Sequence, residues 1–222
     1  MTAKKRIYKH DLKEDHFVTA TFQFTSYVRE HQNLFISILA VIVIVAIVIA
    51  VAMSSRGRSK EDAGRMLGEA TILYQQGNFD GAIERCQALI DQHGGSKHAA
   101  NGVVYLADSH LKLQHYEDAI NAFQLYLDKY DDDDFLVASS LTGIATCHEQ
   151  LDQFSQAGDF YLKAAEDVPG FYGAPEAIMN SGRCYATAGE IEKARASYQK
   201  LIADYGESRY MNLAKMALSE LQ

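Results

Sequence analysis

The longest uninterrupted apolar stretch of the chain runs from Leu34 to Met53 and holds no charged residue. A helix of about 20 residues crosses the roughly 30 Å hydrocarbon layer of a membrane. Val and Ile favour strands in water, but in lipid only a helix satisfies all of its own backbone groups. A cleaved signal peptide is the alternative, which the missing small-x-small pattern after Met53 disfavours. The sequence therefore predicts one transmembrane helix over residues 34–53.

Residues 1–33 are predicted to form an N-terminal tail with an amphipathic helix. Side chains there recur at helical spacings of four, three and four residues. This stripe could lie along the membrane surface or against a partner helix. A plain helical extension of the span explains the spacing equally well, so both interpretations stay open. The residues of the stripe are Phe17, Thr21, Phe24 and Val28.

After a short linker, residues 54–59, the chain repeats one pattern of small and large side chains four times. Each copy centres on an alanine that follows a turn, and these alanines lie 37, 38 and 37 residues apart. A small residue lies twelve positions before each alanine, and a larger residue lies four positions after it. In the order small residue, turn residue, alanine and larger residue, the sets are Ala70, Phe79, Ala82 and Cys86; Ala107, Tyr116, Ala119 and Phe123; Ala145, Phe154, Ala157 and Tyr161; and Gly182, Ile191, Ala194 and Tyr198.

Small residues at matched positions let two helix backbones approach closely, and the larger residue one turn later fills the space beside them. The pattern therefore predicts four antiparallel helical hairpins within residues 60–207. Gly77 and Gly189 supply the permissive backbone that two of the hairpin turns use. The predicted helices are residues 60–76 and 79–92, 97–113 and 116–130, 134–150 and 153–167, and 174–188 and 190–204.

A further helix is predicted over residues 208–221, within a C-terminal segment 208–222. It has one apolar face and polar groups elsewhere. Because an end repeat has no neighbour to cover its apolar side, we expect this helix to cap the array. Its apolar face holds Tyr210, Leu213, Ala214, Ala217, Leu218 and Leu221.

The repeated columns resemble the tetratricopeptide repeat, in which small residues, an aromatic near the turn and an aromatic in the second helix recur at the same offsets. The resemblance covers about residues 60–205. The period is longer than the usual 34 residues of that repeat, and the proline that often closes the motif is absent. Longer connections of this kind are familiar in bacterial envelope proteins of the family. The resemblance implies an all-α solenoid behind the apolar helix.

Stacked hairpins of this family curve into a superhelix whose inner surface is lined by the first helix of each pair and binds a peptide or a partner helix. The resemblance therefore implies that the chain binds other proteins. Mixed polar and aromatic side chains on these helices suit adaptable peptide contacts. The candidate partner-binding residues are Asn101, Tyr105, Asp108, Ser139, Thr142, Glu149, Asn180 and Arg183.

Charge narrows the class of partner. Residues 54–222 carry 15 basic against 25 acidic groups, a net charge of −10. Because nucleic-acid binding rests on Lys and Arg neutralising phosphates, we expect no nucleic-acid partner. The three cysteines are far apart and include no CxxC pair, so we interpret them as packing residues rather than as a disulfide framework or a zinc site. They are Cys86, Cys147 and Cys184.

Two histidines and one acidic cluster are the remaining candidates for chemistry. His110 and His148 are equivalent in successive repeats and could face one another as a metal pair, although packing is the favoured interpretation. Asp131–Asp134 precede a helix whose dipole they would complement, and calcium binding is the disfavoured alternative. The sequence shows no nucleophile elbow, glycine-rich phosphate loop or HExxH motif. We therefore expect a protein that is not an enzyme and has no cofactor, bound metal or small-molecule substrate.

The charges on the two sides of the apolar helix do not by themselves decide how it is oriented in the membrane. Six basic residues precede the apolar stretch and four follow it closely. A long downstream domain translocates largely regardless of its charge, and an acidic array is not expected against an anionic cytoplasmic leaflet. We expect the N-terminus in the cytoplasm, the apolar helix in a bacterial inner membrane and the repeats in the periplasm.

The layout of a basic tail, one span and an acidic array with long repeats resembles the YfgM-type ancillary subunits of the bacterial Sec translocon. That resemblance implies a membrane-anchored scaffold that assists exported or envelope proteins. The alternative is a structural adaptor, a fixed subunit of a large membrane protein complex.

Overall fold

The computed structural model describes residue 27 and residues 29–221, and within them it contains helices and no strand. The chain divides after Gly57 into two compact units, residues 1–57 and 58–222. The expectation of an all-α protein is therefore confirmed. The amphipathic stripe expected in the tail, Phe17, Thr21, Phe24 and Val28, lies outside the described residues.

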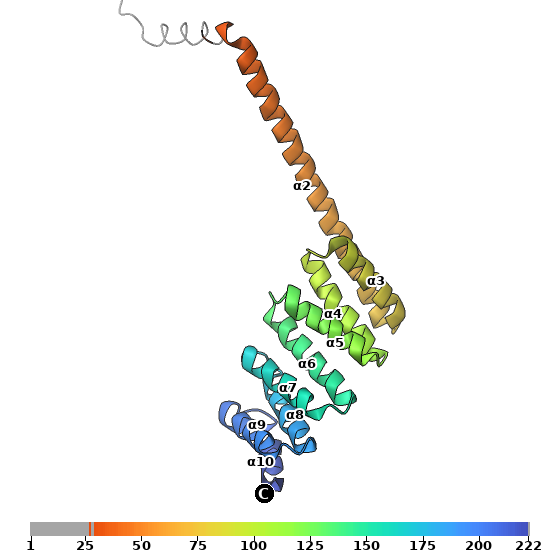
Figure 1. Cartoon of the computed structure of the whole chain (residues 1–222), viewed down its shortest axis with the longest axis vertical. Helices are drawn as coiled ribbons and strands as arrows, with labels where there is room; N and C mark the ends of the chain where they lie inside the picture. Colours follow the sequence, from red (N-terminus) through yellow and green to blue (C-terminus); the bar gives the residue numbers. More distant parts are fainter. Residues whose placement is uncertain (1–26, 28, 222) are drawn as a thin grey trace, which may run out of the picture. The chain divides into compact units, whose positions relative to one another are not determined.

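The longest helix, α2, runs from Gln32 to Gln75 (Figure 1). Its segment Gln32–Val51 is long and apolar enough to cross a membrane, with a mean hydropathy of 3.5, and fits either a membrane span or a signal sequence near the N-terminus. The residues assigned to a linker, 54–59, lie inside α2. They include one glycine and no proline, and a single glycine weakens a helix by only about 1 kcal/mol. The linker is therefore helical.

The unit 58–222 is a series of helices in which neighbours along the chain pack on one another, and α4 also contacts α6 (Figure 1). Helices α3 to α9 agree with the predicted ones to within one residue at each end. They are α3 (Phe79–His93), α4 (Lys97–Lys112), α5 (Tyr116–Lys129), α6 (Asp134–Gln150), α7 (Phe154–Asp167), α8 (Ala174–Thr187) and α9 (Ile191–Asp204). The predicted helix 60–76 is the end of the longer α2, and the C-terminal helix, α10 (Met211–Glu220), begins three residues later than predicted.

The repeated small and large side chains form the core of this unit. The four central alanines are fully buried, as are the small residues twelve positions before them. The larger residues that follow are buried as well, from Cys86 at 0% exposed to Tyr161 at 6%. Each such aromatic contributes about 1.5–3 kcal/mol through its burial. The predicted packing, in which small residues let the helices approach and larger residues fill the space beside them, is confirmed.

Glycines allow additional close approaches between helices. A Cβ atom on Gly158 of α7 would lie 2.7 Å from the ring of Tyr185 in α8. One on Gly102 of α4 would lie 2.8 Å from the side chain of Leu89 in α3. Since real Cβ contacts are longer, both sites admit only glycine without a shift of the neighbour.

All four hairpin turns use a residue in the left-handed region. Gly77 and Gly189 have φ of 76° and 79°, as the sequence predicts. Gln114 and Asp152 hold the equivalent positions with φ of 63° and 57°. The turn geometry is thus the same in each hairpin, whether or not a glycine is present.

Tyrosines tie the open ends of two hairpins. Tyr130, after α5, donates its hydroxyl to the carbonyl of Gly94, which precedes α4, over 2.6 Å. Tyr205, after α9, does the same to Pro169 ahead of α8 over 3.2 Å. In the hairpin of α6 and α7 the equivalent residue is Val168, which has no hydroxyl to donate.

The C-terminal helix covers the last hairpin in part. Ala214 is buried, and Tyr210, Ala217, Leu218 and Leu221 pack against the core beside α9. The prediction that Leu213 faces inward is wrong, because its side chain is 50% exposed. The helix begins at Met211 rather than Ser208, because a turn around Ser208–Tyr210 precedes it.

Candidate partner-binding groove

The first helices of the second and third hairpins enclose a cleft of about 490 Å³. Helix α4 contributes Asn101, Tyr105 and Asp108 to its wall, and α6 contributes Ser139 and Thr142. These residues recur at spacings of three and four, so one face of each helix points into the cleft. The wall mixes amide, hydroxyl, carboxylate and aromatic groups. Such a surface can hydrogen-bond an extended backbone and pack against its side chains.

A second cleft of about 250 Å³ continues on the other side of α6. It shares Thr142 and Thr146 with the first cleft and adds Asn180 and Glu176 from α8. The two clefts together form a groove lined by α4, α6 and α8, which we call the inner groove. The first helices of three successive hairpins therefore line one continuous surface.

A third cleft, of about 520 Å³, lies beside the connection between α7 and α8. Its wall includes Phe135 from the first turn of α6 and Phe171 and Tyr172 from the connection. Phe135 stacks on Tyr172 with ring centres 6.1 Å apart and an interplanar angle of 17°. Tyr172 is 82% exposed, so this aromatic cluster presents its rings to solvent. Because Phe171 and Tyr172 also line the second cleft, the cluster forms the edge of the inner groove.

The structure places six of the eight predicted partner-binding residues in the wall of the inner groove. The other two, Glu149 on α6 and Arg183 on α8, form an ion pair with an N–O distance of 2.8 Å. The six residues in the wall are Asn101, Tyr105, Asp108, Ser139, Thr142 and Asn180.

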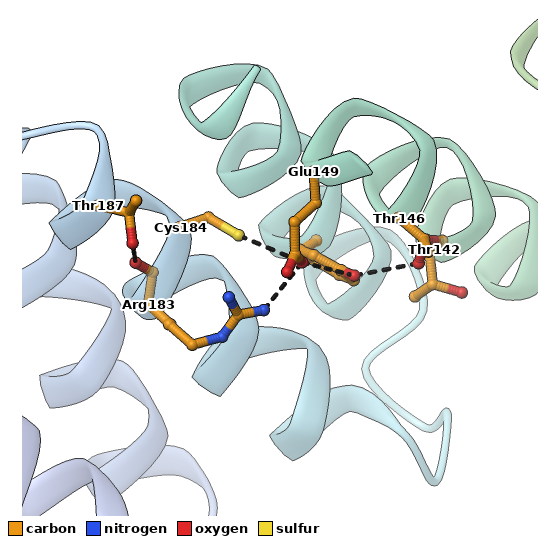
Figure 2. A network of polar contacts seen from close by, with 7 residues as sticks. Thr142, Thr146, Glu149, Arg183, Cys184 and Thr187 are labelled. Carbon is orange, nitrogen blue, oxygen red and sulfur yellow. Dashed lines mark hydrogen bonds and ion pairs between the residues drawn. The ribbon is translucent and has the colours of Figure 1, made fainter. Parts of the chain in front are cut away.

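Figure 2 shows the Glu149 carboxylate between the Arg183 guanidinium and the Cys184 thiol. Burial by itself raises the pKa of Glu149, but the hydrogen bond and the charge of Arg183 outweigh burial, and the pKa is lowered. The Tyr161 hydroxyl, 3.0 Å from Thr146, also reaches this carboxylate. The network joins α6, α7 and α8. It links the first helices α6 and α8 beside the groove.

The carboxyl group of Asp108 in the groove wall has an altered acidity. Its carboxyl is half-buried beside Tyr105, and burial raises its pKa to about 6, against an opposing effect of the Lys112 charge. A carboxylate held in a partly desolvated wall interacts strongly with a cation brought beside it. The ionised side chain therefore favours basic groups of a partner.

Sequence reasoning missed the aromatic cluster and Thr146. Phe135 carries the available signal, since it is an apolar residue in the first turn after four aspartates. Tyr161 was predicted only as a packing residue, and its hydroxyl also takes part in the polar network. The connection at 168–173 could not be placed from periodicity, because it belongs to no helix.

Most of the other candidates for chemistry have packing or capping partners. The three cysteines are buried and free, which confirms their interpretation as packing residues. Asp133 accepts hydrogen bonds from the backbone N–H groups of Phe135 and Leu136 and caps α6, as expected of the acidic cluster. His148 stacks on Phe160 and bonds to Gln153. Among the described residues, the group of possible metal ligands that contains His110 consists of His110, His115 and Asp118 and does not contain His148.

Models of one family match most of the array. A tetratricopeptide-repeat model matches residues 67–134 and 106–170, and a second matches residues 176–208, so that together they cover more than half of the chain. The chain is a tetratricopeptide-repeat protein. A search of curated proteins gives no match.

Solved structures agree with this fold. A tetratricopeptide repeat protein from Parabacteroides merdae superposes with a TM-score of 0.59 at 15% identity, over 74% of this chain and 60% of that one. MamA gives 0.54 at 18% identity, over 68% and 81% of the two chains. PilF of Pseudomonas aeruginosa gives 0.54 at 13%, over 73% and 68%. The chain spans less than two thirds of the Parabacteroides protein, and at these identities the likeness is one of fold.

Tetratricopeptide repeats are protein-interaction modules, so their presence makes this chain a protein-binding scaffold. The position of the groove on the first helices is the one expected for such a scaffold.

Proposed function

We propose that this tetratricopeptide-repeat protein binds extended segments of partner proteins in its inner groove, and that the partner segments carry basic residues. The observation that carries the proposal is the continuous wall formed by α4, α6 and α8, with hydrogen-bonding side chains at each step. An extended peptide offers a backbone N–H and C=O at every residue, which these groups can bind.

The charge of the groove supports a basic partner. Asp108 and Glu176 line the wall, and Asp134 lies beside the aromatic cluster. Three cations lie near the wall. Glu149 neutralises Arg183, Arg209 lies 3.6 Å from Glu176 on the exposed surface, and the charge of Lys112 acts on Asp108 without cancelling the effect of its burial. Lys or Arg side chains of a partner would find carboxylates along the wall and exposed rings at its edge, to which cations are attracted.

Photo-crosslinking in native membranes tests the groove directly. A photoreactive residue at position 101 or 180 is expected to crosslink partner proteins, whereas one at position 121 is not, because Asn121 is exposed on the second helix α5 and lines none of the three clefts. Asn101→Arg and Asn180→Arg are expected to reduce crosslinking from the other groove position by at least about 10-fold through like-charge repulsion of a basic partner and loss of space. Asn121→Arg is the matched control. Equal crosslinking from all three positions contradicts the proposal.

The apolar segment of α2 is proposed to anchor the protein in a bacterial inner membrane, with the repeats in the periplasm. There the protein would assist exported or envelope proteins, in the manner of YfgM-type translocon subunits. Support comes from the length and hydropathy of Gln32–Val51 and from the acidic array. Protease added to intact spheroplasts is expected to digest residues 60–222. Protection of those residues would exclude the periplasmic location.

A second candidate is a structural adaptor in a large membrane complex. The exposed apolar side chains of α10, Leu213 at 50% and Met216 at 62%, favour this function, because a fixed subunit interface would cover them. Purification in mild detergent distinguishes the structural adaptor from the groove-binding function. A stoichiometric set of subunits whose recovery requires Leu213 and Met216 supports the adaptor, whereas substoichiometric partners that depend on Asn101 and Asn180 support the groove.

A further inference from the structure

At two of the hairpin turns, side chains from equivalent repeat positions contact one another. In the third hairpin, His148 Nδ1 lies 2.6 Å from Gln153 Oε1. In the fourth, Lys193 Nζ lies 2.7 Å from a Glu190 oxygen and 4.9 Å from the centre of the Tyr185 ring. Tyr185 and Glu190 are the repeat equivalents of His148 and Gln153. The site is thus local. It is made of one residue near the end of the first helix, the residue just before the second helix, and one residue in the first turn of the second helix.

In the second hairpin these three positions hold His110, His115 and Asp118. One ligand atom from each lies within 4.8 Å of the others. His110 Nδ1 is buried and, among the described residues, has no hydrogen-bond partner, whereas the equivalent nitrogen of His148 is bonded.

His115 occupies the position before α5, and its side chain makes no capping hydrogen bond. Gln153 and Glu190, at the equivalent positions before α7 and α9, make none either, but their side chains bond to His148 and to Lys193 and Ser155. Asn78 occupies this position in the first hairpin and caps α3 by accepting a hydrogen bond from Gly81 N–H. The second hairpin therefore has two imidazoles and a carboxylate at positions where side chains bond one another in the third and fourth hairpins.

We propose that His110, His115 and Asp118 bind a divalent transition-metal ion of the Zn²⁺ class. Two imidazoles and a carboxylate suit Zn²⁺, Cu²⁺ and Ni²⁺, whereas Ca²⁺ and Mg²⁺ prefer oxygen ligands alone. Neighbouring donors of a tetrahedral Zn²⁺ with bonds of about 2.1 Å are about 3.4 Å apart. His115 and Asp118 are exposed, so both side chains can rotate to close this distance. Three protein ligands leave the fourth position to water.

The metal would join the two helices of one hairpin. His110 is on α4 and Asp118 on α5, with His115 in the turn between them. Because the unfolded chain does not hold the three ligands together, the ion binds the folded protein and stabilises it. None of the three residues is among those lining the inner groove, so the metal site does not depend on the proposed binding of partners.

Zn²⁺ binding to the full, untagged chain in detergent is measured by calorimetry, and the repeats themselves supply the variants. His115→Asn introduces the residue found at the equivalent position of the first hairpin, Asn78. His110→Leu likewise introduces the equivalent of His110 in that hairpin, Leu73. Each is expected to remove one Zn²⁺ per chain, or to weaken that ion at least about 10-fold. Saturating Zn²⁺ is expected to raise the thermal midpoint of the wild type by about 5 °C and that of His115→Asn by much less.

His93→Ala is the matched control for the other histidines of the chain, and it is expected to retain the ion. His93 bonds to Ser59 at 3.1 Å and belongs to no such group of ligands. Equal binding by the wild type and His115→Asn would overturn the proposal.

A gain of binding tests whether the three positions suffice. The double change Gln153→His and Gln156→Asp rebuilds the set beside His148 in the third hairpin. This variant is expected to bind one more Zn²⁺ than the wild type. A variant that folds with the wild-type helical content and binds no additional ion would overturn the assignment of the site to these positions.

Discussion

Gln114 and Asp152 keep a left-handed backbone without the benefit of glycine. For residues with a Cβ this conformation costs about 1–2 kcal/mol, less for Asp, which can hydrogen-bond locally. The equivalent positions 77 and 189 are glycine, so the same turn forms both with and without a glycine. The conformation is set by the hairpin and not by the residue.

Replacing Gln114 by Gly is expected to stabilise the protein by about 0.5–1 kcal/mol, because relief of the left-handed strain exceeds the added entropy of the unfolded chain. Chemical denaturation of the wild type and variant measures the change. The reverse substitution, Gly77→Gln, is the control and should destabilise by a similar amount, since no atom lies within 4 Å of its Cβ position to add a steric cost. A lower stability for Gln114→Gly would be inconsistent with this account.

Asp108 predicts a dependence of stability on pH. Burial raises its pKa to about 6 in the folded protein, from an ordinary value of 3.8, so the folded state holds the proton more tightly than the unfolded state does. Its contribution to stability is therefore highest at low pH and falls as pH rises from about 4 through 6. Asp108→Asn is expected to stabilise the protein by about 1–3 kcal/mol at pH 8 and by less at pH 5.

Denaturation of Asp108→Asn at the two pH values measures this difference. Glu84→Gln, at an exposed position on α3, is the control and should change stability equally at both. An effect of Asp108→Asn that does not vary with pH would argue against a raised pKa.

At the level of the helix pair, the notches and the residues that fill them decide which helices can pack. Gly158→Ala is expected to destabilise by about 1–3 kcal/mol, because the new methyl group would crowd the Tyr185 ring. The ring cannot move freely, since its hydroxyl donates to Asp159 at 2.7 Å.

Gly68→Ala makes the same change inside helix α2, where nothing lies within 4 Å. It is expected to stabilise by up to about 1 kcal/mol through helix propensity. Thermal unfolding of both variants measures the change in stability that each substitution causes. Shifts of the same sign would mean that close packing at Gly158 does not matter.

The open end of the α6–α7 hairpin lacks the tyrosine tie found in the hairpins before and after it. We expect backbone amides at the end of α7, residues 165–167, to exchange with deuterium faster than residues 127–129 of α5 and 202–204 of α9. Hydrogen exchange followed by mass spectrometry measures the three segments. Equal protection would show that Tyr130 and Tyr205 do not hold their hairpin ends. Tyr130→Phe, which removes one of the two hydroxyl groups, is compared with the wild type in the same experiment.

The sequence predicts the helices well because one physical signal recurs four times. An alanine or glycine facing an aromatic residue has few alternatives to a close helix crossing, and the burial of Ala82 and Tyr198 follows from it. The end of the array is harder, as Leu213 shows. One short helix with apolar residues on two faces does not reveal which face is covered, because no second copy repeats the pattern.

The groove could be predicted only in outline. Asn101 and Thr142 follow from helical spacing on a first helix. Tyr172 and Phe171 do not, because their position depends on a connection whose path no periodicity describes. The His115 position shows a third limit. Its chemistry appears only when the three-dimensional neighbours of each repeat position are compared, since the ligands are five and three residues apart in a turn.

Among the described residues, every buried side chain of the repeat core lies within residues 58–222. We therefore expect these residues, produced alone, to fold in water without detergent and to unfold cooperatively. Circular dichroism and calorimetry check both properties. Residues 80–222, which lack the end of α2 and its buried residues Ala63 and Ala70, should be much less stable. An unfolded fragment 58–222 would show that the array requires the first unit.

The two clefts of the inner groove adjoin along α6, where Thr142 and Thr146 belong to both. A partner with two short motifs could seat one motif on each side of this helix. Once the first motif is bound, the second is held at a high effective concentration, and the avidity can exceed either single affinity by about 10²–10⁴. Weak, exchangeable contacts at each cleft would then be enough for tight retention of a bivalent chain and rapid release of a monovalent one.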